Sequence, residues 1–139
     1  MSREAIYQAL FARVSTAADF ATATRRVKEY AGVDQATQPA ILQVELGEKW
    51  AEPGVPPQPV VLRARLFIYC ESNDPTAPVS TQVNTLMDAV VAALAPPDIE
   101  DRQTLGGLVY SASIVGDVTI AEGLSGQSEV SIPIEIMLG

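Results

Sequence analysis

The segment from residue 105 to residue 139 constrains the fold most, because it alternates apolar and polar residues and contains almost nothing that does chemistry. Its final run is typical of a strand with one apolar face, made of Val130, Ile132, Ile134, Ile136 and Leu138. Pro133 lies in the middle of this run and has no N–H to donate to a neighbouring strand. The pattern therefore predicts an edge strand, and such an edge must be covered, blunted or paired with another chain. We expect assembly rather than catalysis.

Hydrophobic periodicity predicts two helices, over residues 3–18 and 79–94, and Pro96 and Pro97 end the second. Alternation with a period of two predicts strands over residues 20–30, 39–46, 60–70, 107–115, 118–122 and 130–138. Within residues 39–46, the apolar Leu42, Val44 and Leu46 alternate with Gln43 and Glu45, as in a half-buried strand. This order predicts an α+β fold with a mixed or antiparallel sheet, two helices packed on one face, and a C-terminal β-hairpin region.

Length and charge limit the class of protein. The 139 residues fit a single domain over 1–139, with no apolar run long enough to span a membrane and no secretion signal. We therefore expect a protein made in the cytoplasm.

The net charge of −8 argues against specific nucleic-acid binding. The charge is uneven, because residues 1–30 carry five basic and three acidic side chains, whereas the remainder carries four basic and fourteen acidic ones. Such asymmetry suits either stacking against partners or simple solubility.

Few side chains here are suited to catalysis. The chain has no histidine, which removes the commonest general base near neutral pH and the commonest metal ligand. Cys70 is the only cysteine and lies within a predicted strand, so we expect a buried thiol and no zinc site. The acidic residues do not have the spacing of a helix-loop-helix calcium site. The sequence predicts no enzyme activity, no cofactor and no metal site.

Two regions are candidates for contacts with other proteins. Trp50 lies in the proline-rich segment 47–59, where it either contacts a partner or folds back to cap the core. In the strand 60–70, Leu62, Ala64, Leu66, Ile68 and Cys70 form an apolar face. The opposite face carries Arg63, Arg65, Phe67 and Tyr69. That mixed face either meets a neighbouring subunit or is a solvated sheet face.

Several short segments, taken in order, resemble the tail terminator (tail completion) proteins of long-tailed bacteriophages. The resemblance covers most of the chain and lies in the basic run 24–28 after the first helix and in residues 38–42, 67–69, 83–90, 104–107, 114–116 and 132–136. In sequence these read TRRVK, QPAIL, FIY, VNTLMDAV, TLGG, IVG and IPIEI. The ordered set is more specific than any single segment.

The resemblance implies a structural virion protein located in the tail or neck and assembled in the host cytoplasm. Six copies would form a ring that caps the tail tube, ends tube polymerisation and provides a surface for the head connector. Arg25, Arg26 and Lys28 match the family's basic segment and are implied to face a partner, although a solvated turn is the other interpretation. DNA would pass through an acidic lumen without specific binding. Alternatives are another ring-forming neck or adaptor protein, or a small α+β domain that holds an anion at Arg63 and Arg65.

Overall fold

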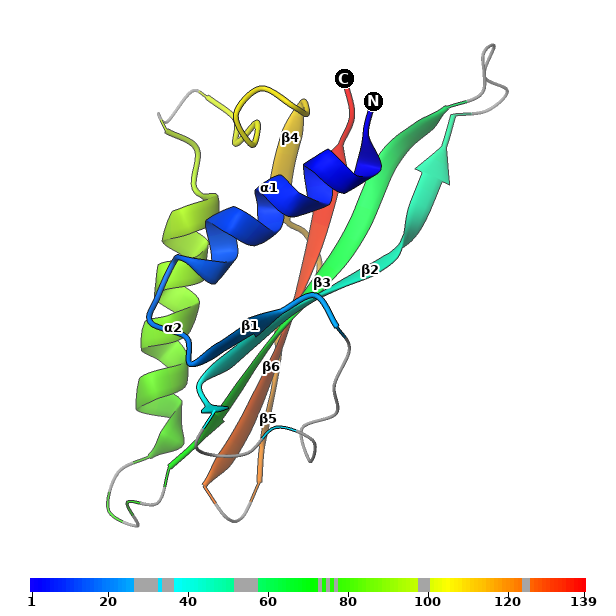
Figure 1. Ribbon diagram of the computed structural model, residues 1–139. Coiled ribbons are helices and arrows are strands. Elements are labelled where there is room, and N and C mark those ends of the chain that lie inside the picture. The colour runs from blue at the N-terminus through cyan, green and yellow to red at the C-terminus, as the bar shows by residue number, and fades with distance from the viewer. Residues whose placement is uncertain are drawn as a thin grey trace.

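The computed structural model describes residues 1–26, 33, 37–51, 58–72, 74, 76, 78–97, 101–123 and 126–139. The elements follow the order predicted from the sequence (Figure 1). They are α1 (Arg3–Ser15), β1 (Thr22–Thr24), β2 (Ala40–Trp50), β3 (Pro59–Glu71), α2 (Val79–Leu94), β4 (Ser111–Ile114), β5 (Thr119–Glu122) and β6 (Gln127–Met137). The expected α+β class is confirmed.

The six strands form one mixed sheet in the order β1-β2-β3-β6-β4, with β5 also paired to β6. β1 is parallel to β2, and the other described pairs are antiparallel. β5 and β6 form the expected C-terminal hairpin. Both helices contribute to one apolar core with the same face of the sheet, and α1 crosses in front of that face in Figure 1. The opposite face has no helix among the described residues.

The two central strands account for most of the core. The alternating residues of β3 and β6 that face the helices are almost fully buried: Leu62, Ala64, Leu66, Ile68, Cys70, Val130, Ile132, Ile134 and Ile136. The register pairs Leu66 with Ile132 and Ile68 with Val130, so the two apolar rows lie side by side. α1 adds Ile6, Leu10 and Val14 at helical spacing. The apolar row predicted for residues 60–70 is therefore the middle of the core.

The prediction of an edge position for the last strand is wrong. β6 is paired with β3 along its length and with β4 and β5 on its other side. β4 pairs with residues 134–137 and β5 with residues 128–131, so Pro133 falls in the gap between them. The Pro133 carbonyl accepts a hydrogen bond from the Val115 N–H on that side (3.2 Å), just where the partner chain turns away. A missing proline N–H costs nothing at such a break, which explains how Pro133 fits a central strand.

The apolar row predicted for β2 lies on the sheet face without helices, away from the main core. Leu42 lies on the face without helices, whereas Ile41 and Gln43 point toward α1. Gln43 is 1% exposed, and its side-chain N–H donates to the Tyr7 carbonyl of α1 (2.9 Å). This hydrogen bond gives the amide nitrogen a partner at a position where alternation predicts a solvent-facing side chain, whereas the buried Gln43 Oε1 atom has no partner among the described residues.

One predicted strand begins later than expected. β4 starts at Ser111 rather than at residue 107, because Leu105, Gly106 and Gly107 all have positive φ and form a turn. A left-handed backbone cannot continue an extended strand.

Candidate interaction surfaces

Within the described residues, no group of three or more Cys, Asp or Glu side chains is arranged to hold a metal ion. None of the described helices is long and apolar enough to cross a membrane. The described surface carries grooves, ion pairs and exposed apolar side chains.

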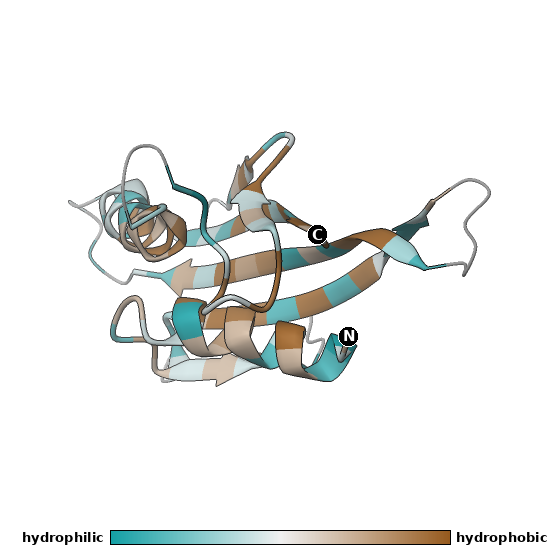
Figure 2. Ribbon diagram, turned by 90° about the horizontal axis from the view of Figure 1, so that it is seen from above, coloured by the Kyte–Doolittle hydropathy of each residue, from teal (hydrophilic) through white to brown (hydrophobic). Residues whose placement is uncertain are grey.

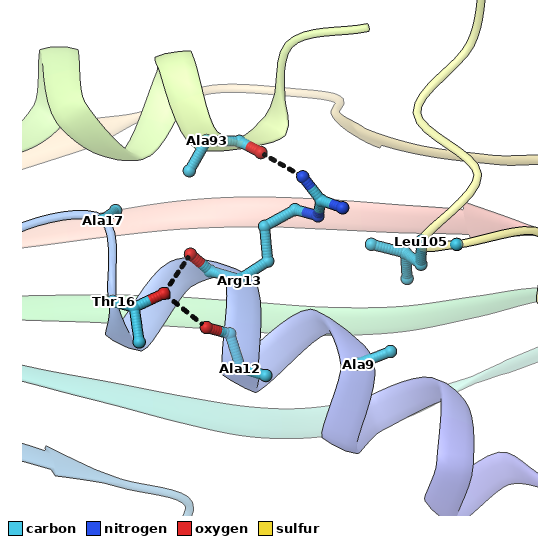
Figure 3. A pocket seen from close by; sticks show the side chains of 8 residues that line it. Ala9, Ala12, Arg13, Thr16, Ala17, Ala93 and Leu105 are labelled. Atoms are coloured by element: carbon cyan, nitrogen blue, oxygen red, sulfur yellow. Dashed lines mark hydrogen bonds between the residues drawn. The ribbon is translucent and has the colours of Figure 1, made fainter. Parts of the chain in front are cut away.

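A groove of about 520 Å³ lies between α1 and α2, next to the turn that contains Leu105 (Figure 3). Half of its lining residues are alanines, from Ala9 on α1 to Ala93 on α2. The Arg13 guanidinium crosses this groove and donates to the Ala93 carbonyl (3.4 Å) in the last turn of α2. A cation at the C-terminal end of a helix stabilises exposed carbonyls. Arg13 therefore joins the two helices.

Arg25 is held within the subunit. Its guanidinium forms ion pairs with Glu4 of α1 and with Glu45 of β2, the latter at 2.7 Å. These hydrogen bonds raise the pKa of Arg25, with Glu4 the larger cause. The contact links the segment after β1 to the helix and to the sheet. Arg26, in contrast, is exposed, and Lys28 lies outside the described residues.

Trp50 is placed at the end of β2, whereas the sequence suggested a loop. It is 45% exposed and donates from its indole N–H to Glu48 (2.9 Å), so it does not cap the core. Glu48 also forms an ion pair with Arg3 at the start of α1, and this hydrogen bond lowers the pKa of the Glu48 carboxyl. A lowered pKa means that the pair is formed at neutral pH and is lost as the pH falls through that value.

Trp50 belongs to a projecting ribbon that we call the β2–β3 arm, defined by residues 49–51 and 58–60. The ladder between β3 and β6 ends at the Val61–Met137 pair, and one further hydrogen bond, from the Leu138 N–H to the Val60 carbonyl (3.0 Å), reaches the base of the arm. The Ala51 N–H donates to the Gln58 carbonyl (3.2 Å) and continues the two-stranded pairing. In Figures 1 and 2 the ends of β2 and β3 extend past the N-terminus of α1. A ribbon of two strands is marginally stable by itself in water. Contact with another protein would stabilise the arm, which makes it a candidate contact element.

Arg63 and Arg65 lie on the sheet face without helices, as the alternation along β3 requires. They form part of a groove of about 420 Å³ that we call the open-face groove. Arg63 and Arg65 of β3 and Pro133 and Glu135 of β6 line its middle, Leu46 of β2 lies at one side, and Val115, Asp117 and Thr119 lie at the other. The Arg63 Nε to Glu135 Oε1 distance is 3.4 Å. Because the groove carries both signs of charge, it is poorly suited to a free anion.

Cys70 is buried in the core, and burial raises the pKa of its thiol to about 11. Since the thiolate is the reactive form, we expect Cys70 to resist alkylation by iodoacetamide at pH 8 in the folded protein. In denaturant the same thiol should react with iodoacetamide as fast as a free cysteine does. Labelling followed by mass spectrometry measures both rates. Equal rates with and without denaturant would show that Cys70 is accessible in the folded chain.

No protein-family model matches this chain, and no curated protein is significantly similar to it. The structure itself shows an α+β fold, a projecting arm with an exposed tryptophan, and a sheet face that no described helix covers.

Proposed function

We propose that this chain is a structural virion protein of the tail terminator type. Six copies form a ring at the end of a phage tail tube, stop its polymerisation and join it to the head connector. The proposal rests on the ordered sequence resemblance, on a fold of the expected class, and on one structural observation. That observation is the β2–β3 arm, which extends beyond the body of the subunit and exposes Trp50 at 45%.

An arm of this kind suits a ring because each subunit must reach its neighbour. Large aromatic side chains dominate the energetics of protein interfaces when a partner buries them. Trp50 is held in a fixed place by the Trp50–Glu48 hydrogen bond and the Glu48–Arg3 ion pair, which limits the entropy lost on contact. In this proposal Trp50 is the anchor between neighbouring subunits, and the exposed Arg26 faces the tube or the connector.

The net charge of −8 per subunit bears on the lumen of such a ring. Binding to DNA requires neutralisation of phosphates by basic side chains, so acidic walls would let DNA pass without adhering. The role is structural, with no catalysis and no cofactor.

Replacing Trp50 by alanine tests this proposal in the phage genome that carries the gene. Without the chain, we expect overlong tail tubes and heads without tails. Wild-type protein supplied in trans should restore joined particles, whereas Trp50→Ala should lower their yield at least about a hundredfold, as expected for loss of an aromatic hot spot from a repeated contact. Electron microscopy and plaque counts measure the two outcomes.

Val91→Ala is the matched control, because Val91 is a large apolar side chain, 50% exposed, that lies on α2 away from the arm. It should restore particles as well as the wild type does. Full activity of Trp50→Ala would contradict the assignment of the arm to the ring contact.

A further inference from the structure

We infer that two free copies of this chain pair through the open-face groove, about a two-fold axis that runs along the strands between β3 and β6. This inference does not depend on the proposed ring. The sheet topology fixes the order of side chains across the groove.

Four regions of different chemical character lie side by side across the groove. The β2 side is apolar at Leu46, β3 is basic at Arg63 and Arg65, and β6 is acidic at Glu135. The β4–β5 side is apolar at Val115, with Asp117 close by in sequence. Between the apolar sides lie a basic row, Arg63 and Arg65 of β3, and an acidic row in which Glu135 of β6 is the one charged side chain that lines the groove.

A two-fold axis between the charged rows makes this order complementary to itself. Rotation about an axis parallel to the strands turns one groove over onto the other and exchanges its left and right sides. The basic row of each copy then faces the acidic row of the other, and Leu46 faces Val115. Such an isologous contact uses the same patch on both subunits, and each pair of residues occurs twice.

The register places the charges at matching heights. Arg63 and Glu135 are direct partners across β3 and β6, so rotation along the strand direction brings Arg63 of one copy over Glu135 of the other. Packed sheets lie about 10 Å apart, a gap that an extended arginine and a carboxylate bridge together. Within one subunit their 3.4 Å contact is long for a hydrogen bond, so a second carboxylate would improve the arrangement.

Arg65 gives an independent reason. Its Nε atom is buried and has no hydrogen-bond partner among the described residues. A buried donor without a partner costs free energy, and an arginine is well suited to a carboxylate acceptor. Because this atom is covered within its own subunit, the pairing would have to turn the Arg65 side chain toward Glu135 of the second copy, which the rotation places one pair of residues along the strand.

The apolar sides of the groove are exposed in the single subunit, with Leu46 at 52% and Val115 at 46%. Burying them against each other removes apolar surface from water in two symmetric places. An acidic nucleic acid would meet Glu135 and Asp117 as well as the arginines, so the mixed charge favours a second copy over a polyanion. The dimer would be a store of free subunits and would separate before the arm builds a ring.

Two charge-reversed proteins test the pairing. One carries Arg63→Glu and Arg65→Glu, and the other carries Asp117→Lys and Glu135→Lys. Light scattering of the wild type should give twice the subunit mass of 14.8 kDa. Each variant alone should give the subunit mass, with a dissociation constant raised at least about a hundredfold by like charges. An equimolar mixture should return to twice the mass, with one copy of each variant by native mass spectrometry.

Only face-to-face pairing of the two rows predicts rescue by mixing, because both symmetric contacts then join opposite charges. Arg26→Glu is the control, since it reverses an exposed charge outside the groove and should leave the dimer intact. Circular dichroism confirms that both variants are folded, as exposed ion pairs contribute little to stability. A wild-type chain that stays monomeric at all concentrations, or variants that stay monomeric when mixed, would overturn the inference.

Discussion

Leu66→Ala is expected to lower the free energy of unfolding by about 3 kcal/mol. Leu66 is fully buried in the middle of β3, opposite Ile132 of β6 and beneath the helices. Truncation removes the transfer free energy of the side chain and leaves a cavity that neighbouring strands cannot easily close, because β3 is paired on both sides. Urea denaturation followed by circular dichroism gives the difference.

Leu108→Ala is the control for this variant, since it makes the same chemical change at a side chain that is 49% exposed. We expect a change within about 0.5 kcal/mol there. Similar losses for both variants would show that Leu66 is not in the core and would contradict the arrangement of the sheet and helices.

Gly126→Ala is expected to cost about 2–5 kcal/mol, because two penalties add. Gly126 has φ of +75°, a conformation that costs other residues about 1–2 kcal/mol. A Cβ atom at Gly126 would also lie 2.4 Å from the Ser72 carbonyl oxygen. This backbone atom cannot rotate away, and the Ser72 N–H is itself bonded to the Gly126 carbonyl (2.9 Å). Relieving the overlap costs about another 1–3 kcal/mol.

Gly106→Ala separates the two penalties. Gly106 has nearly the same φ, +76°, but no atom lies within 4 Å of an added Cβ. It should therefore show only the conformational cost of about 1–2 kcal/mol. Thermal or urea unfolding of both variants measures the difference. If Gly126→Ala were no worse than Gly106→Ala, the close approach of the β6 hairpin to the end of β3 would be wrong.

The sequence predicted the elements well because their patterns are local. The period of α2 and its end before Pro96 can be seen within a single window of the chain. The position of β6 cannot. Whether Pro133 lacks a partner depends on where β4 and β5 pair, and that break is a property of three strands together.

The contact residues show the same limit. Arg25 appeared as one member of a basic run, but its partners Glu4 and Glu45 lie 21 and 20 residues away. Nothing local in the sequence distinguishes it from the exposed Arg26. Alternation did place Arg63 and Arg65 on one face of β3, yet their relation to Glu135 follows only from the pairing with β6. The open-face groove was therefore predicted in part, and its charge order was not.

The most direct test of the structural role is the position and copy number of this chain in purified phage particles. Immunogold electron microscopy with an antibody to the chain should label the junction between tail and head. Quantitative mass spectrometry against a labelled standard should give six copies per particle. A chain absent from particles, or one spread along the whole tail, would contradict the assignment to a terminating ring.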